Sequence, residues 1–512
     1  MTKTVCSLFA LAALAGSAGL ARAQVPPSSG PDVIVGELYD PQNYGLVGGI
    51  RAYAIGTYSC NIGPSPLRWE SGNQFHPVIS QNMYRLLNGR FEHVGQSWLK
   101  HGFCALQGNL CSSCTPGGSC PALYPGCSDP YSGGLNGTQS GLGPKSEVNA
   151  ASGVFTYPYV LQGTGDATLK KRLQVADADM GNAGATYFVA SMYVQQEDAA
   201  NHNNTNNESY RRVSVDPTTK AISLAASTQR MKPAIMAWKD NGLGPGSPDP
   251  NVQLAAIDVA NDGRFWIGSK ATDNGDGTWS YEYAVQNLTS DRSGQAFTIQ
   301  LPPGAVVSSV GFHDVNYHSG EPWSGADWTS SVTGTAISWS SQTYAQNVNA
   351  NALRWDTLYN FRFTCNVPPA AGPGTITLFK PGTPTSVSAN VVSPSADGQF
   401  HPFNDSCASA TDVGDGVTGF SNVNADTDGP NEPGPCAING YTQIGADVWY
   451  RYTAACAGDL TVSTCGTAFD TKLAVYAGCP LGDGSASGKR AVRQDIYSAP
   501  LLHLVGSNAR AL

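Results

Sequence analysis

The sequence predicts an all-β protein with three parts: an N-terminal β-rich domain with a disulfide-stapled loop, an immunoglobulin-like β-sandwich, and an incomplete C-terminal β-sandwich. Short runs of alternating apolar and polar residues recur along the chain, and turns rich in Gly, Asn and Asp separate them. An alternation with a period of two is typical of strands with one buried face. Charged residues make up only 13% of the chain, which suits a β protein with many turns and long loops.

The N-terminus has the pattern of a secretory signal peptide. Lys3 supplies a positive start, residues 5–20 form an apolar run, and Ala21-Arg22-Ala23 is a small-x-small cleavage site. The run is too short and too rich in Ala and Gly to make a membrane helix, and no later stretch reaches the ~18 apolar residues that such a helix needs. We therefore expect residues 1–23 to be removed by cleavage after Ala23. The protein is then secreted, and acts in the extracellular space or at the cell surface.

The charge of the chain excludes some partners. Without Lys3 and Arg22, 27 basic residues stand against 38 acidic ones, which leaves a net charge of −11. An acidic chain without basic runs argues against binding to nucleic acid or to an anionic membrane. With no predicted transmembrane helix, the expected partner is an extracellular polysaccharide or another protein.

Residues 24–262 are predicted to form the first β-rich domain, which contains a cysteine cluster. Its segment "MYRLLNGRFEHVG" predicts a hairpin, because Asn88-Gly89 is a strong two-residue turn between alternating runs. Some apolar residues of this segment also have near-helical spacing, and we prefer the hairpin. In an oxidising compartment, clustered cysteines more often form disulfides than hold zinc, although a C-x-x-C pair allows either. The cysteines expected in disulfides here are Cys60, Cys104, Cys111, Cys114, Cys120 and Cys127.

Residues 263–380 show the clearest strand pattern and are predicted to form the immunoglobulin-like sandwich. The acidic segment 273–277, "DNGDG", lacks the ligand spacing of an EF-hand loop, so we expect a hairpin turn there. Weak Ca²⁺ binding is the alternative. Residues 381–402, rich in Pro, Ser and Gly, are predicted to be a linker.

Residues 403–512 are predicted to form the C-terminal accessory sandwich. The run "DVWYRYTA…GDLTVSTCG…FDTKLAVYAGC" resembles a bacterial pre-peptidase C-terminal-type module over residues 404–480, and this resemblance implies a non-catalytic accessory role. After it the composition changes abruptly to "GKRAVRQDIYSAPLLHLVGSNARAL", and the module holds an odd number of cysteines, five. Both features indicate a truncated or frame-shifted terminus.

The larger part of the chain has a resemblance of its own. The segments "HPVISQNMYRL", "SWLKHGF", "GFHDVNYHSGE" and "NALRWDTLYNFRF" resemble a group of uncharacterised secreted bacterial β-rich proteins over residues 48–380. This resemblance implies export and brings no known activity with it.

Two sets of side chains are candidates for a functional site. His313 and His318, with His93 or His101, have the chemistry to bind zinc, copper or iron. On a flat strand, however, His313 and His318 face opposite sides, so a shared ion requires a bulge or turn between them. The other interpretation is that these histidines hydrogen-bond to the backbone in loops.

The tryptophans are the second set. Trp323 and Trp328 lie in a Gly/Ser/Asp-rich loop and are expected to be a surface pair that binds ligand, since flat aromatic faces stack on sugar rings and on protein. Trp355 is expected in the sandwich core. Lys145-Ser146 invites a Ser/Lys catalytic interpretation, but adjacent residues point apart in a strand, so a solvated loop is expected.

These observations favour a secreted binding or structural module over an enzyme. The alternative is a secreted zinc- or copper-dependent enzyme built on the histidine cluster. No nucleophile lies in a recognised catalytic signature, so the function prediction rests on export, the β class and the exposed aromatic residues.

Overall fold

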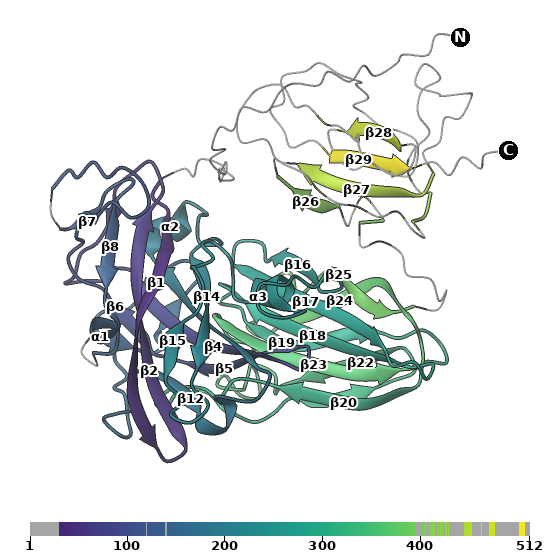
Figure 1. Cartoon of the computed structure of the whole chain (residues 1–512), viewed down its shortest axis with the longest axis horizontal. Helices are drawn as coiled ribbons and strands as arrows, with labels where there is room; N and C mark the ends of the chain where they lie inside the picture. Colours follow the sequence, from purple (N-terminus) through teal and green to yellow (C-terminus); the bar gives the residue numbers. More distant parts are fainter. Residues whose placement is uncertain are drawn as a thin grey trace, which may run out of the picture.

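The computed structural model describes residues 30–395, apart from 119, 139 and 140, together with shorter segments between 402 and 506. Two large β domains lie side by side, and a smaller sheet follows near the C-terminus (Figure 1). The described residues contain three short α-helices among many strands, which confirms the all-β prediction. The expected signal peptide, residues 1–23, lies outside the described residues.

The first domain is built on an eleven-stranded sheet. Its strands are β1 (Val33–Val47), β2 (Ile50–Asn61), β4 (Val78–Leu87), β5 (Arg90–Gln96), β6 (Leu99–His101), β8 (Ser128–Tyr131), β9 (Leu142–Gly143), β12 (Leu173–Ala176), β13 (Thr186–Val194), β14 (Glu208–Val215) and β15 (Ile222–Leu224). The main order is β1-β2-β12-β5-β4-β13-β14-β15, while β8 pairs with β2, β6 with β4, and β9 with β6.

Short elements connect these strands, and α3 (Met236–Asn241) lies between β15 and the second domain. The connecting elements are β3 (Leu67–Arg68), β7 (Ala122–Leu123), α1 (Gly133–Asn136), η1 (Lys145–Glu147), β10 (Val148–Asn149), β11 (Val154–Phe155), η2 (Asp177–Asp179) and α2 (Gln196–Ala200). The two 3₁₀ turns, η1 and η2, are each three residues long.

The eleven-stranded sheet curls toward a barrel. Side chains on β14 reach β1, with Ser209 Oγ donating to the carbonyl of Val35 at 2.7 Å. Apolar residues on the concave face, among them Ile55, Met83 and Tyr193, form a buried core. Curling lets strands at opposite ends of the sheet share this core, which a flat sheet could not enclose.

The predicted hairpin at Asn88-Gly89 is confirmed. Leu87 pairs with Arg90, so the turn has two residues. Asn88 and Gly89 have φ angles of 53° and 78°, as a type I′ turn requires. The segment forms strands instead of a helix because β4 pairs with β5 and β13, and most of its apolar side chains, among them Met83, Leu86 and Phe91, are buried.

The second domain is a β-sandwich, which confirms the sandwich prediction. One five-stranded sheet contains β16 (Gln253–Asp258), β17 (Arg264–Asp273), β18 (Trp279–Asn287), β23 (Thr357–Cys365) and β20 (Val307–His313), in that order. The other contains β21 (Thr329–Val332), β22 (Ala336–Ser340), β19 (Gly294–Gln300), β24 (Pro369–Leu378) and β25 (Ser386–Pro394). Aromatic side chains of both sheets, including Tyr283, Phe297 and Phe361, fill the core between them.

The sandwich extends beyond the predicted 263–380 at both ends. β16 begins at Gln253, and β25 occupies Ser386–Pro394 within the stretch expected to be a linker, 381–402. The linker prediction is corrected there because the sequence "SVSANVVSP" alternates, and β25 pairs with β24 over nine residues. The Pro- and Ser-rich composition of this edge strand led to its prediction as a linker.

The barrel-like domain and the sandwich share an apolar interface. Trp238 of α3 is buried together with Tyr84 of the first sheet and with Leu358 of β23. Gly268 of β17 permits this packing, because a Cβ there would lie 2.9 Å from the Trp238 ring. Arg90 adds a two-pronged ion pair with Glu282, at 2.6 and 3.0 Å. The two domains are therefore one packed unit.

The described C-terminal strands form a four-stranded sheet in the order β26-β27-β29-β28. They are β26 (Thr411–Val413), β27 (Asp447–Tyr452), β28 (Thr471–Tyr476) and β29 (Leu501–Gly506). β29 belongs to the tail with the changed composition, and it pairs with both β27 and β28. Throughout the described part of the chain, no helix is long and apolar enough to span a bilayer.

Candidate functional site

The six N-terminal cysteines form three disulfides, which confirms the disulfide prediction. The pairs are Cys60–Cys111, Cys104–Cys120 and Cys114–Cys127, with Cα–Cα distances of 6.1, 4.7 and 4.4 Å. Cys111 and Cys114 therefore do not share a zinc ion. The bonds tie the long loop between β6 and β8 to itself and to β2, where hydrophobic residues are too few to hold it.

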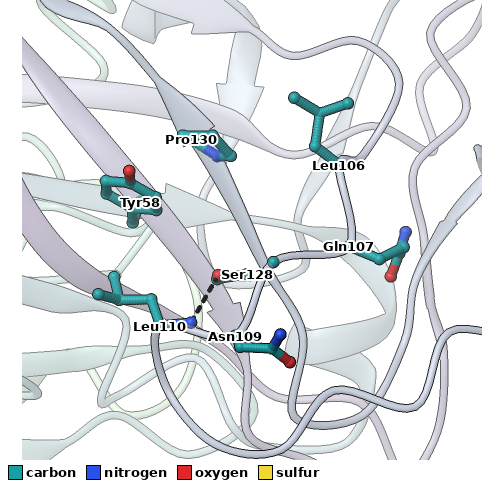
Figure 2. A pocket seen from close by; sticks show the side chains of 8 residues that line it. Tyr58, Leu106, Gln107, Asn109, Leu110, Ser128 and Pro130 are labelled. Carbon is teal, nitrogen blue, oxygen red and sulfur yellow. Dashed lines mark hydrogen bonds between the residues drawn. The ribbon is translucent and has the colours of Figure 1, made fainter.

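A groove of about 510 Å³ lies on this stapled loop. In Figure 2, Tyr58 and Leu110 lie on one side of Ser128, and Leu106 and Gln107 on the other. Ser128 Oγ accepts a hydrogen bond from the backbone N–H of Leu110 at 3.1 Å, and this bond attaches the loop to β8. Leu106 is 61% exposed, which makes the groove partly apolar.

Asp129, next to Ser128, anchors the same loop. Its Oδ1 accepts a hydrogen bond from the backbone N–H of Leu106 at 2.7 Å. Burial raises the pKa of the Asp129 carboxyl to about 7, against hydrogen bonds that lower it. A buried carboxyl with a pKa of about 7 therefore holds the backbone of Leu106, which lines the groove.

The candidate histidines do not surround a common centre. His93 is fully buried: its Nε2 contacts the Gly95 carbonyl at 2.9 Å, and its Nδ1 accepts from the N–H of Leu358 at 3.3 Å. Burial holds the pKa of the His93 imidazole well below its usual value. His93 thus joins the two domains as a neutral side chain with both ring nitrogens occupied.

The other histidines have separate surroundings. His101 packs against His76, with ring centroids 4.7 Å apart, and stacks on Tyr157. His318 contacts its neighbouring carbonyl at Ser319 through Nδ1 at 2.7 Å, and burial lowers the pKa of its imidazole to about 4. His313 ends β20 and is partly buried.

Within the described residues, no three His, Cys, Asp or Glu side chains are arranged to hold a metal ion. The "DNGDG" segment is a hairpin turn between β17 and β18, as expected, and its Asn274, Asp273 and Asp276 side chains bond within the turn. The local geometry therefore favours the backbone-bonding interpretation of the histidines over the metal interpretation.

Trp328 is not a surface residue, and this expectation is corrected. Its side chain is 5% exposed and stacks on Phe312 in the sandwich core, with ring centroids 5.7 Å apart. Its Nε1 donates to the Asn351 carbonyl at 2.5 Å. The burial of Trp328 was not predicted because its neighbours in sequence are polar. The loop turns this one side chain inward. Trp355 is buried, as expected.

Trp323, in contrast, is half-buried and lines a cavity of about 200 Å³. We call this the end-loop cavity. It is lined by Lys145, Ser146, Val148, Asp291, Ser293, Pro322, Trp323, Tyr344, Val348, Asn349, Arg354, Trp355 and Lys380. Most of these residues come from connections at one end of the sandwich: β18–β19, β20–β21, β22–β23 and β24–β25. The remainder come from η1 and β10 of the first domain.

Backbone hydrogen bonds hold these connections together. Phe379 and Lys380 donate to the carbonyls of Ser293 and Arg292, both at 2.9 Å, and Ser324 donates to Asn349 at 2.7 Å. Loops fixed on a rigid sandwich are a common place for binding sites. The end-loop cavity is therefore a preformed hollow between two domains.

Arg354 dominates the chemistry of this cavity. Its side chain is 4% exposed and donates from Nη2 to the carbonyls of Val348 and Ala350, both at 3.0 Å. Its guanidinium lies 5.0 Å from the Trp323 ring and 4.6 Å from the Phe379 ring, in two cation–π contacts. Its Nε has no hydrogen-bond partner in the described part of the chain. Arg354 is thus a buried cation held in place by aromatic faces.

The other charged groups of the cavity are neutralised. Lys380 Nζ pairs with Asp291 at 2.7 Å, and Lys145 Nζ with Asp356 at 2.8 Å. Glu321, beside the cavity, accepts from the backbone N–H groups of Lys145 and Ser146 at 2.6 and 3.2 Å, and burial raises the pKa of its carboxyl to about 7.

Lys145 was expected in a solvated loop, and this expectation is corrected. Its side chain is 1% exposed, because η1 inserts it between the domains toward Asp356. Sequence reasoning also missed Arg354, Tyr344 and Lys380 as members of a site. The signal available for Arg354 was a single cation in the otherwise uncharged run "NANALRW".

No protein-family model matches the chain, and no curated protein matches it.

Proposed function

We propose that this chain is an exported binding protein that holds an extracellular polysaccharide in the end-loop cavity. The observation that carries the proposal is the pairing of Trp323 and Tyr344 with polar and cationic groups in one preformed hollow. Aromatic rings give apolar faces for sugar rings, and convergent polar groups give orientation. The cavity volume lies below the ~300–1,000 Å³ of drug-sized sites, so it fits a single sugar unit or a chain end.

Export is supported by the three disulfides, which form and persist in oxidising compartments. The signal-peptide pattern that ends at Ala23 points the same way. Within the described residues, His93 and Lys145 are buried ionisable groups that lie in structural contacts between the domains, which fits a binding role.

The test is a glycan array followed by titration of tryptophan fluorescence with the glycans that bind. Trp323→Ala should abolish binding, while Leu243→Ala, at an exposed position outside the cavity, should leave it unchanged. Equal glycan binding by wild type and Trp323→Ala would contradict the proposed site. Stoichiometric zinc or copper that is lost in His318→Ala would instead support the metal-dependent enzyme.

A further inference from the structure

We infer that the end-loop cavity selects a sugar that carries a carboxylate, with the guanidinium of Arg354 as the group that recognises it. The inference rests on the proposed function and adds the charge of the ligand.

Three cations and one carboxylate belong to the lining. Lys380 is neutralised by Asp291, and Lys145 by the buried Asp356 behind it. Arg354 forms no ion pair among the described residues; it donates to two backbone carbonyls and hydrogen-bonds to the uncharged Tyr317 side chain. Arg354 is therefore the lining cation that has no ion-pair partner within the described residues.

A buried charge without a counter-ion is unfavourable, and a bound anion relieves it. One residual charge matches a monoanion better than a doubly charged phosphate. A guanidinium presents planar, paired donors that match the two oxygens of a carboxylate. The contacts of Trp323 and Phe379 with Arg354 orient this group before any ligand arrives, which reduces the entropy lost on binding.

The remaining lining fits the body of a sugar rather than a bare carboxylate ion. Trp323 and Tyr344 supply ring faces, and Asn349 and Ser293 supply groups that can hydrogen-bond to hydroxyls. A hexuronic acid, free or at the end of a polysaccharide, combines a carboxylate with these features.

The experiment is isothermal titration of the full chain at pH 7 with D-glucuronate and D-galacturonate, each beside its neutral partner, D-glucose or D-galactose. Acetate and inorganic phosphate are added as separate ligands. Uronates should bind at least about tenfold more tightly than the neutral sugars, the size expected of a charge-assisted hydrogen bond. Arg354→Gln should remove most of this difference.

A second variant covers the case in which Arg354→Gln does not fold. Lys380 is 36% exposed, so Lys380→Gln should fold, and it leaves the Asp291 carboxylate unpaired at the cavity wall. Lys380→Gln should weaken uronate binding several-fold and spare neutral sugars. Lys232→Gln, which breaks a similarly exposed Lys–Asp pair outside the cavity, is the matched control and should change neither.

The outcomes separate the inference from the proposed function. Equal binding of uronates and neutral sugars, unchanged in Lys380→Gln, overturns the carboxylate inference and leaves sugar binding standing. Acetate or phosphate that binds as tightly as the uronates overturns the sugar part of the inference. No binding by any of these ligands, or by the array glycans, overturns both.

Discussion

Lys145 and Asp356 form an ion pair across the junction of the two domains, with 2.8 Å between Nζ and Oδ2 and side chains that are 1% and 0% exposed. The two residues are 211 positions apart in the chain. Asn82 completes the contact: its amide donates to Asp356 Oδ1 at 2.7 Å, and its oxygen accepts from Lys145 Nζ at 3.1 Å. This triad places η1, and with it one wall of the end-loop cavity, against the sandwich.

Asp356→Asn should destabilise the protein by about 3–5 kcal/mol, because it leaves the Lys145 ammonium buried without a counter-charge. The free energy of unfolding in urea measures this change. Removing both charges in Lys145→Met/Asp356→Asn should recover part of the loss. Asp258→Asn, which breaks the more exposed pair with Arg264, is the control and should cost about 0–1 kcal/mol. A loss of similar size in both single variants would contradict a special role for the buried pair.

The disulfides should differ in their contribution to stability. Cys60–Cys111 closes a segment of 51 residues and Cys114–Cys127 one of 13, so the first restricts the unfolded chain more. On chain entropy, replacing the pairs by Ser should cost about 4 and about 3 kcal/mol respectively. Denaturant unfolding of the two double variants measures the order. The reverse order would show that native-state packing, rather than loop length, decides the contribution.

Asp129 should make stability depend on pH. Its pKa is about 7 in the folded protein and about 3.9 in an unfolded chain, so folding takes up a proton between these values. The contribution of Asp129 is then most favourable at pH 4 and below, and it is lost as the pH rises to 7.

The measurement compares wild type with Asp129→Asn at pH 5 and pH 8, so that the other titrating groups cancel. Relative to the variant, wild type should lose roughly 2–3 kcal/mol between these two pH values, from about 1.4 kcal/mol per pH unit. Asn keeps an oxygen that can accept from the Leu106 N–H, which preserves the contact. A difference that does not change with pH would contradict the raised pKa.

Substitution of the two loop tryptophans should have different effects: one should lower mainly stability and the other mainly ligand binding. Trp328→Ala empties a core position and should cost about 3–5 kcal/mol. Trp323→Ala removes a half-buried ring from the cavity wall and should cost less in stability while it abolishes ligand binding. Urea denaturation and fluorescence titration of each variant measure the two effects. A small stability loss in Trp328→Ala would place that ring outside the core.

Local patterns by themselves determined the β class, the turn at Asn88-Gly89, the hairpin at residues 273–277 and the presence of disulfides among the six clustered cysteines, although not which cysteine bonds to which. These features depend on neighbours in sequence: side-chain alternation, the backbone angles that Asn and Gly tolerate, and the crowding of thiols in a loop that lacks a core. The strand at Ser386–Pro394 was missed because its composition is that of a linker, although its alternation was visible.

Only the tertiary structure decided that two cations and one loop tryptophan are buried. Lys145, Arg354 and Trp328 have polar or loop-like sequence surroundings, yet each is buried by segments distant along the chain or by a turn of its own loop. Burial of such groups depends on long-range packing, which no short window of sequence contains. For the same reason, the end-loop cavity exists only where four loops of the sandwich meet η1 of the other domain.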